Sequence, residues 1–163
     1  MGPKDAPSLL EHRYQMFVDI GNYSHRLLRA HLRWYALWAQ RMRRERRFRA
    51  WGWEAADGEL VASGALWLQE GRPHPFLGPG FQPYILSMYT APAHRGKGLA
   101  AEIVREMLRW SAGRNYGRVI LHASPMGRPV YEALGFIDGP EMRFNLFAHG
   151  APSRRRSRRV RGR

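Results

Sequence analysis

The sequence predicts an α/β (α+β) fold in which helices flank a mixed, mostly antiparallel sheet of six to seven strands with a βαβ core. Three observations predict it. Two long stretches with helical periodicity come first, alternating strand-like runs follow from Phe48, and a strand, a helix and a strand succeed one another over residues 82–123. The chain of 163 residues is long enough for a single domain, which we place at residues 1–150. Residues 151–163 form an arginine-rich tail with little apolar surface, and we expect this tail to be disordered.

Two helices are predicted before the first strand. Ser8 followed by Glu11 matches a capping box, which predicts a first helix over about residues 8–19 that Gly21 ends. Apolar residues recur every three or four positions over residues 24–46, and this spacing predicts a second, amphipathic helix.

The apolar period changes to two at Phe48, and the dipeptide Asp57-Gly58 predicts a tight hairpin turn. The returning strand, residues 60–68, is nearly all small or apolar, which is typical of a strand buried on both faces. A loop rich in proline and glycine follows over residues 71–80. Its composition fits a cover over a substrate pocket and a crossing of the sheet edge equally well.

The second half of the chain contains the βαβ core. A strand over residues 82–90, a helix from Leu99 and a parallel strand over residues 118–123 are predicted to form it, with a right-handed crossover. A short helix comes next. A final hairpin between residues 136–137 and 142–147 is predicted to complete the sheet.

The turn before the long helix, His94-Arg-Gly-Lys-Gly-Leu-Ala100, predicts an anion site. Glycines let a ligand approach the main chain, and the first amides of a helix have no partner within it. Arg95 and Lys97 add positive charge at the same place. A Walker loop is excluded because Gly98 stands where it needs Ser or Thr, and a dinucleotide fingerprint because Ala101 replaces its third glycine.

Arg95, Gly98 and Ala100 form an Arg-x-x-Gly-x-Ala pattern that resembles motif A of the GCN5-related N-acetyltransferase (GNAT) superfamily. About thirty residues on, residues 121–136 resemble the family's second signature, which is a strand, a short helix carrying a tyrosine and a Leu-Gly-Phe turn. The resemblance implies a GNAT-like domain that binds acetyl-CoA. It also implies an N-acetyltransferase that transfers the acetyl group directly from the thioester to a primary amine of a small molecule or peptide, in a ternary complex.

The resemblance assigns functional residues as well. Tyr131 is the implied catalytic residue and would serve the departing CoA thiolate. The implied cofactor-binding residues are Met88, Tyr89, Thr90, Arg95, Gly96, Lys97, Gly98, Leu99, Ala100 and Ser124. The first three would hold the pantetheine arm through their main chain, next to a β-bulge expected near Ser87 and Met88. Ser124 either bonds a pantetheine amide or caps a turn.

Other candidates stay open. Three aromatic residues of the second helix either pack in the core or line an acceptor pocket, namely Trp34, Tyr35 and Trp38. Arg128 could reach a phosphate or a substrate anion. Four residues are conceivable general bases, none of them favoured by the sequence: Glu54, Glu70, His74 and His122.

Composition excludes several classes of site. The chain has no cysteine, so disulfides, thiolate metal sites and a cysteine acyl-enzyme are excluded. No group of His, Asp and Glu has metal-ligand spacing, and we predict no metal. Because no apolar run approaches membrane-spanning length and the first residues lack the apolar core of a signal peptide, we expect a cytoplasmic protein without membrane contact.

The net charge of +14 is concentrated in two segments. Seven arginines lie within residues 154–163, and six lie between residues 41 and 49, where the second helix is predicted to end. We interpret the second cluster as a solvated helix end, because cations complement the dipole there. The tail could contact nucleic acid nonspecifically, and the alternative function is therefore an inactive GNAT fold that binds RNA or the ribosome through it. A homodimer is left open.

Overall fold

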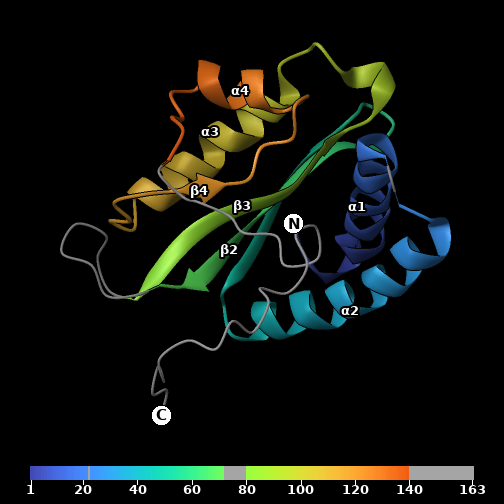
Figure 1. Cartoon of the computed structure of the whole chain (residues 1–163), viewed down its shortest axis with the longest axis horizontal. Helices are drawn as coiled ribbons and strands as arrows, with labels where there is room; N and C mark the ends of the chain where they lie inside the picture. Colours follow the sequence, from blue (N-terminus) through green and yellow to red (C-terminus); the bar gives the residue numbers. More distant parts are fainter. Residues whose placement is uncertain (22, 72–79, 140–163) are drawn as a thin grey trace, which may run out of the picture.

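The structure, a computed structural model, describes residues 1–21, 23–71 and 80–139. Its elements in chain order are η1 (Pro3–Asp5), α1 (Ala6–Ile20), α2 (His25–Arg44), β1 (Phe48–Glu54), β2 (Leu60–Glu70), β3 (Phe81–Thr90), η2 (Pro92–His94), α3 (Leu99–Ala112), β4 (Ile120–Leu121) and α4 (Arg128–Ala133). The sheet runs between two helix pairs, with α1 and α2 on one side and α3 and α4 on the other (Figure 1).

The strand order is β1-β2-β3-β4, in which the first two pairs are antiparallel and β3 pairs with β4 in parallel. The predicted mixed, mostly antiparallel sheet with a βαβ core is therefore confirmed. The described residues contain four strands rather than six or seven. Residues 136–137 are not assigned to a strand, and their predicted partner, residues 142–147, lies outside the described residues.

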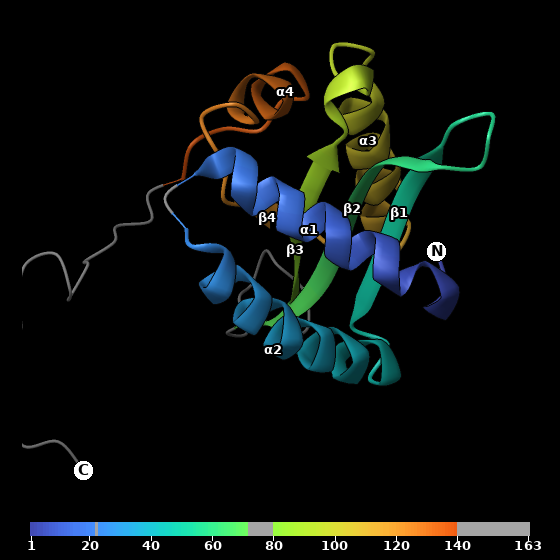
Figure 2. The ribbon, with the colours of Figure 1, turned by 90° about the vertical axis from the view of Figure 1, so that its right-hand side faces the viewer.

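Strand β2 is the centre of the core, as its composition predicted. Residues 61–66 are all buried, and both faces of the strand are covered by helices (Figure 2). Helix α3 supplies the main apolar stripe against it, consisting of Leu99, Ile103, Val104 and Met107. This packing fixes the N-terminus of α3 relative to β3, and the candidate site lies between them.

The predicted start of the first helix is wrong. Helix α1 begins at Ala6, and the Asp5 side chain accepts a hydrogen bond from the Gly2 amide at 2.6 Å in the turn before it. Ser8 therefore lies inside the helix, and Glu11 accepts instead from Gln15 at 2.7 Å. A proline in the first turn extends the helix beyond the capping-box pattern, because proline's fixed φ suits that position.

The other local predictions agree better with the structure. Gly21, with φ of 78°, ends α1, and the Ser24 hydroxyl accepts from the Leu27 amide at 3.3 Å to begin α2. Gly58, with φ of 84°, forms the tip of the hairpin between β1 and β2. No helix within the described residues is both long and apolar enough to cross a membrane.

The arginine cluster near residue 45 is only partly a solvated helix end. Helix α2 ends at Arg44, so Arg47 already belongs to the approach to β1. The Arg47 side chain is 15% exposed, donates to the Leu68 carbonyl at 3.0 Å and pairs with Glu70 at 3.0 Å. Arg49 lies over the Trp110 ring, 5.3 Å from its centroid. These two arginines pack against the sheet and α3, which helical spacing could not show.

Candidate active site

Strand β3 carries a β-bulge at Ser87 and Met88, as predicted. Its pairing with β2 stops at Leu86 and resumes at Tyr89, so two residues of β3 face Gly64 alone. Ser87 has φ of 55°, in the left-handed region that residues other than glycine seldom adopt. A Cβ on Gly64 would lie 2.1 Å from the Met88 sulfur, so Gly64 leaves the room that the Met88 side chain occupies.

Strands β3 and β4 part directly before the bulge. Their pairing joins residues 84–85 to residues 120–121, and no further pair forms between them within the described chain. Among the described residues, the main chain of residues 86–90 therefore has no strand neighbour on its β4 side. Met88, Tyr89 and Thr90 lie in this segment, but the Thr90 carbonyl already accepts from Arg95 Nε at 3.0 Å.

The turn that follows β3 presents unpaired amides. Gly96 and Gly98 have φ of 74° and 78°, and Gly98 is the residue that precedes the first turn of α3. The Arg95 amide donates to the Pro92 carbonyl at 3.3 Å, and the Glu102 amide to the Gly98 carbonyl at 3.1 Å. Between them, the amides of residues 96–101 donate to no group in the described part of the chain. This run of donors at a helix N-terminus fits a diphosphate.

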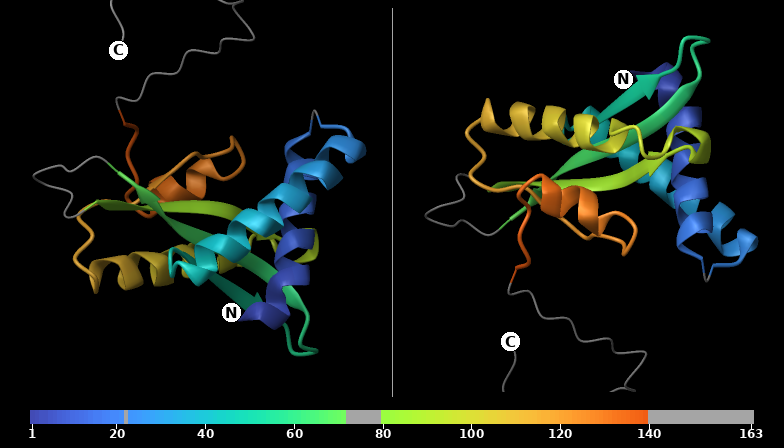
Figure 3. Two further views of the ribbon diagram at one scale, coloured as in Figure 1. Left: turned by 90° about the horizontal axis from the view of Figure 1, so that it is seen from below. Right: turned by 90° about the horizontal axis from the view of Figure 1, so that it is seen from above.

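The side chains around this turn differ in their roles. Arg95 forms an ion pair with Asp19 of α1, so part of its charge is compensated and it ties the turn to that helix. Figure 3, in the view from above, shows the turn lying beside α1. Lys97 is exposed and forms no ion pair within the described residues. Leu99 is buried and Ala100 half-buried, so these two residues anchor the helix.

Ser124 and Tyr131 lie close together, with Gly127 between them. A Cβ on Gly127 would lie 3.2 Å from the Tyr131 ring and 3.3 Å from Ser124 Oγ. Ser124 Oγ accepts from the Gly127 amide at 3.2 Å, so the turn-capping alternative describes its observed contact. The hydroxyl remains able to donate one hydrogen bond.

Tyr131 projects from α4 against the core and meets the Phe136 ring edge-on, with 5.7 Å between centroids. Its hydroxyl forms no hydrogen bond within the described residues, and burial raises the pKa of Tyr131 to about 12. Gly135, with φ of 89°, ends the turn after the helix and so fixes Phe136 beside the tyrosine. Tyr131 therefore offers a neutral hydroxyl at physiological pH.

The other charged candidates have partners of their own. Arg128 pairs with Asp138 at 2.8 Å and with Glu132 at 3.4 Å, and these carboxylates raise its pKa. Its charge is therefore compensated locally. His122 bonds to the Tyr84 hydroxyl.

Of the remaining candidate bases, Glu70 pairs with Arg47 and Glu54 is exposed at the end of β1. His74 lies outside the described residues. No cluster of three or more His, Cys, Asp or Glu side chains within the described residues could hold a metal ion.

A polar network on the other side of β3 was missed by sequence reasoning. Arg13 of α1 donates to Ser87 Oγ at 2.5 Å, and its Nε and Nη2 lie 3.2 and 3.1 Å from His31 Nε2. The Tyr35 hydroxyl lies 3.0 Å from the same serine oxygen. The only sequence signal is that Arg13 shares a helix face with Phe17, where a charge is unexpected.

A second buried pair supports the same helix. His12 is 8% exposed, and its Nδ1 lies 2.8 Å from Ser63 Oγ of β2. Burial lowers the pKa of His12 from its ordinary value, so the ring is neutral at pH 7. His12 also contacts the Tyr89 ring, with 4.8 Å between centroids, and thereby joins α1 to the segment after the bulge.

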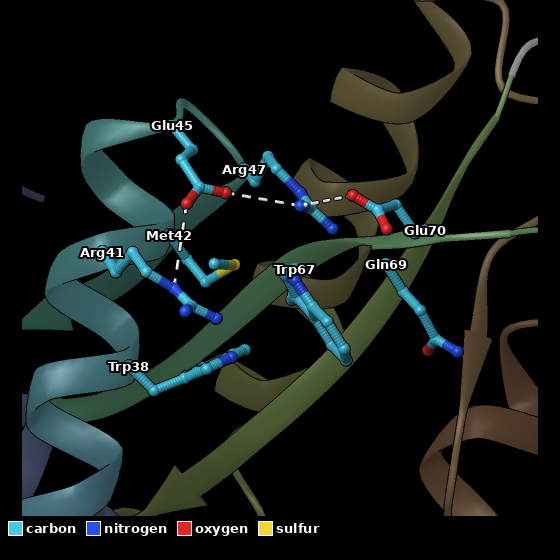
Figure 4. A pocket seen from close by; sticks show the side chains of 8 residues that line it. All are labelled: Trp38, Arg41, Met42, Glu45, Arg47, Trp67, Gln69 and Glu70. Carbon is cyan, nitrogen blue, oxygen red and sulfur yellow. Dashed lines mark hydrogen bonds and ion pairs between the residues drawn. The ribbon is translucent and has the colours of Figure 1, made fainter.

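Aromatic rings extend from this network across the sheet. Trp34, one of the three aromatic residues for which the sequence left a pocket role open, is 74% exposed. Tyr35, the second of them, is buried. Trp38 meets Trp67 edge-on, with 5.1 Å between centroids, and both line a hollow of ≈ 580 Å³. Figure 4 shows the hollow, whose lining is Trp38, Arg41, Met42, Glu45, Arg47, Trp67, Gln69 and Glu70. Of the three aromatic candidates, only Trp38 lines it.

Comparisons with known proteins agree with this geometry. The sequence profile of the acetyltransferase (GNAT) family matches residues 9–136, and no match was found among curated proteins. A predicted acetyltransferase with acetyl-CoA from Clostridium acetobutylicum is similar at 26% identity and a TM-score of 0.81, over 92% of this chain and 96% of that one. A GCN5-related N-acetyltransferase from Ralstonia eutropha JMP134 is similar at 27% identity and a TM-score of 0.78, over 88% and 94%.

A more distant structure shares the fold alone. It is glucosamine-6-phosphate N-acetyltransferase from Arabidopsis thaliana, at 17% identity and a TM-score of 0.65, with 90% of this chain and 95% of that chain covered.

Proposed function

Since the chain belongs to the acetyltransferase (GNAT) family, we propose that it is an acetyl-CoA-dependent N-acetyltransferase acting on a primary amine of a small molecule or peptide. The observation that carries the proposal is the run of unbonded amides at residues 96–101, at the N-terminus of α3 and next to the parted strands. These amides do not stabilise the fold by hydrogen bonding to it, whereas the oxygens of a diphosphate would accept hydrogen bonds from several of them.

Successive groups at this end of the sheet could hold successive parts of acetyl-CoA. The amides of residues 96–101 and the Lys97 ammonium would hold the pyrophosphate. Met88 and Tyr89 would hold the pantetheine arm through main-chain groups on the open side of β3. Acetyl-CoA supplies the activated acetyl group and a thiolate leaving group. The bulge at Ser87 would set the direction in which the arm ends.

Tyr131 would serve the leaving group as a hydrogen-bond donor. The CoA thiol has a pKa of about 8.5, so a phenol with a pKa of about 12 would give up its proton at a cost of roughly 5 kcal/mol. Donating a hydrogen bond without transferring the proton avoids that cost and still stabilises the developing negative charge. We therefore assign Tyr131 an electrostatic role.

Two measurements on the purified full chain test the proposal. Calorimetry should detect acetyl-CoA binding, and a chain that ends at residue 150 should bind with the same affinity, because the tail takes no part. Thiol release should then be screened over a panel of amines, amino acids and peptides.

Salt-sensitive RNA binding without acetyl-CoA affinity would contradict the proposal and support the binding protein instead. Cofactor binding without turnover on any acceptor would support only the cofactor site.

A further inference from the structure

Arg13 lies beside the bulge on the face opposite α3 and α4. Its guanidinium donates to Ser87 Oγ at 2.5 Å and stacks on the Tyr35 ring, 3.8 Å from the centroid. Phe17 covers it from the same helix, 5.0 Å away. The charge is thus enclosed by two rings and by the strand on which the pantetheine arm would end.

The described part of the chain places no negative charge against this guanidinium. Within the described residues, no carboxylate lies within 4.0 Å of Arg13, whereas Arg47, Arg95 and Arg128 each pair with an acid from another segment. Its partners are hydroxyls and His31. Because arginine only donates, the His31 Nε2 that faces it must be unprotonated, and burial together with the charge of Arg13 lowers the pKa of His31.

An enclosed cation with neutral partners is costly to keep. Arg13 is half-buried, and this burial lowers the pKa of Arg13 because partial desolvation disfavours its charged form. A guanidinium has five N–H donors, and the contacts to Ser87 and His31 use one on each of the three nitrogens. The Tyr35 hydroxyl also bonds this guanidinium, so at least one N–H group on a terminal nitrogen remains for an anion.

We propose that Arg13 binds a carboxylate of the acceptor, so that the substrate class is amines that also carry a carboxylate, as amino acids do. This inference rests on the proposed function, because only an acceptor bound beside Ser87 would place its amine near the thioester. Because Arg13 contacts Ser87, a carboxylate bound to Arg13 would lie only a few bond lengths from the bulge. This short distance suits an acceptor whose amine is close to its carboxylate.

The experiment compares matched acceptors on the full chain. Each amino acid of a panel is assayed by thiol release beside the amide of the same amino acid, which keeps the amine and removes the negative charge. We expect the preferred acceptor to exceed its amide at least tenfold in kcat/KM. In Arg13→Gln that ratio should fall to within threefold of one, mainly through KM, while Arg13→Lys should keep part of it.

Arg33→Gln is the matched control, since it removes the charge of an exposed arginine from α2 without touching the network. Its ratio should equal that of the wild type. Calorimetry with acetyl-CoA checks that Arg13→Gln keeps a folded cofactor site. If that variant does not fold, the ratio of kcat/KM for acid and amide is compared between Arg13→Lys and the wild type. A ratio in Arg13→Lys below that of the wild type supports the inference, and an equal ratio contradicts it.

Two results would overturn the inference while leaving the acetyltransferase intact. One is an active wild type that uses amides as well as acids. The other is an Arg13→Gln variant whose kcat falls equally for both members of each pair, because Arg13 would then only hold the bulge. Absence of acetyl-CoA binding and of thiol release with every acceptor would instead contradict the proposed function itself.

Discussion

The two sides of β3 offer different kinds of binding group. On the side of α3, the donors are main-chain amides of six successive residues, 96–101. On the side of α1 and α2, the donor is the side chain of Arg13, and the groups that accept from it, Ser87 Oγ and His31 Nε2, come from distant parts of the chain. A main-chain site depends on a few glycines and on helix position, whereas a side-chain site depends on tertiary packing. The first kind tolerates sequence change and suits a ligand common to a family, and the second suits a ligand that differs among its members.

The largest effect is expected from the residue assigned to the leaving group. Tyr131→Phe removes one hydrogen-bond donor to developing charge, and such donors contribute about 100-fold or more to turnover. We expect kcat to fall by about that factor and the dissociation constant of acetyl-CoA to change less than about threefold. Steady-state kinetics and calorimetry measure the two quantities. Equal turnover in the two proteins would remove Tyr131 from the mechanism.

A smaller effect is expected at the main-chain site. Gly98 has φ of 78°, and alanine in this region costs about 1–2 kcal/mol, so Gly98→Ala should weaken acetyl-CoA binding by about tenfold. Gly139→Ala is the matched control, because Gly139 lacks a positive φ and a Cβ there would meet nothing within 4 Å. An unchanged affinity in Gly98→Ala would mean that the turn does not hold the ligand.

The α1 side of β3 should affect the pH dependence of stability. Burial lowers the pKa of His12 below 6.5, so the unfolded chain binds the proton more readily than the folded one. Stability should therefore fall as pH drops below 6.5, by up to about 1.4 kcal/mol per pH unit for this one group. Urea unfolding of the wild type and of His12→Gln at pH 7 and pH 5 tests this. An equal change in the free energy of unfolding between the two pH values in both proteins would contradict it.

The smallest effect is expected where the two sides are joined. Asp19→Asn breaks the ion pair with Arg95, whose side chain is 36% exposed, and partly exposed pairs contribute about 1 kcal/mol or less. We expect a slight loss in melting temperature and an acetyl-CoA affinity within about threefold of the wild type. A loss of affinity beyond tenfold would show that α1 sets the shape of the cofactor turn.

The turn that we propose to hold the cofactor could be located from the sequence because its determinants are consecutive in the chain. Gly96, Gly98 and the apolar stripe of α3 predict from local pattern alone the glycine turn and the buried face of the helix that follows it. The bulge followed from the family resemblance, and Gly64 opposite it explains why the strand can deform there. Hairpin and helix ends were predictable wherever a glycine needed a positive φ, as at Gly21 and Gly58.

The polar network on the α1 side of β3 could not be predicted in this way. Arg13 and Ser87 are 74 residues apart in sequence and meet only through packing, so no spacing rule links them. The sequence left open whether Trp34 packs in the core or lines a pocket, and the structure leaves this residue 74% exposed, outside the core and outside the hollow that Trp38 lines. Periodicity shows which face of a helix is buried but not what the facing strand contributes.

The most direct test of the central claim is a titration of the isotopically labelled full chain with acetyl-CoA, followed by amide NMR. We expect the amide signals of residues 96–101 to shift, and these amides to exchange more slowly with water, on binding, because the pyrophosphate would accept hydrogen bonds from them. Saturable binding that leaves these amides unchanged would contradict it.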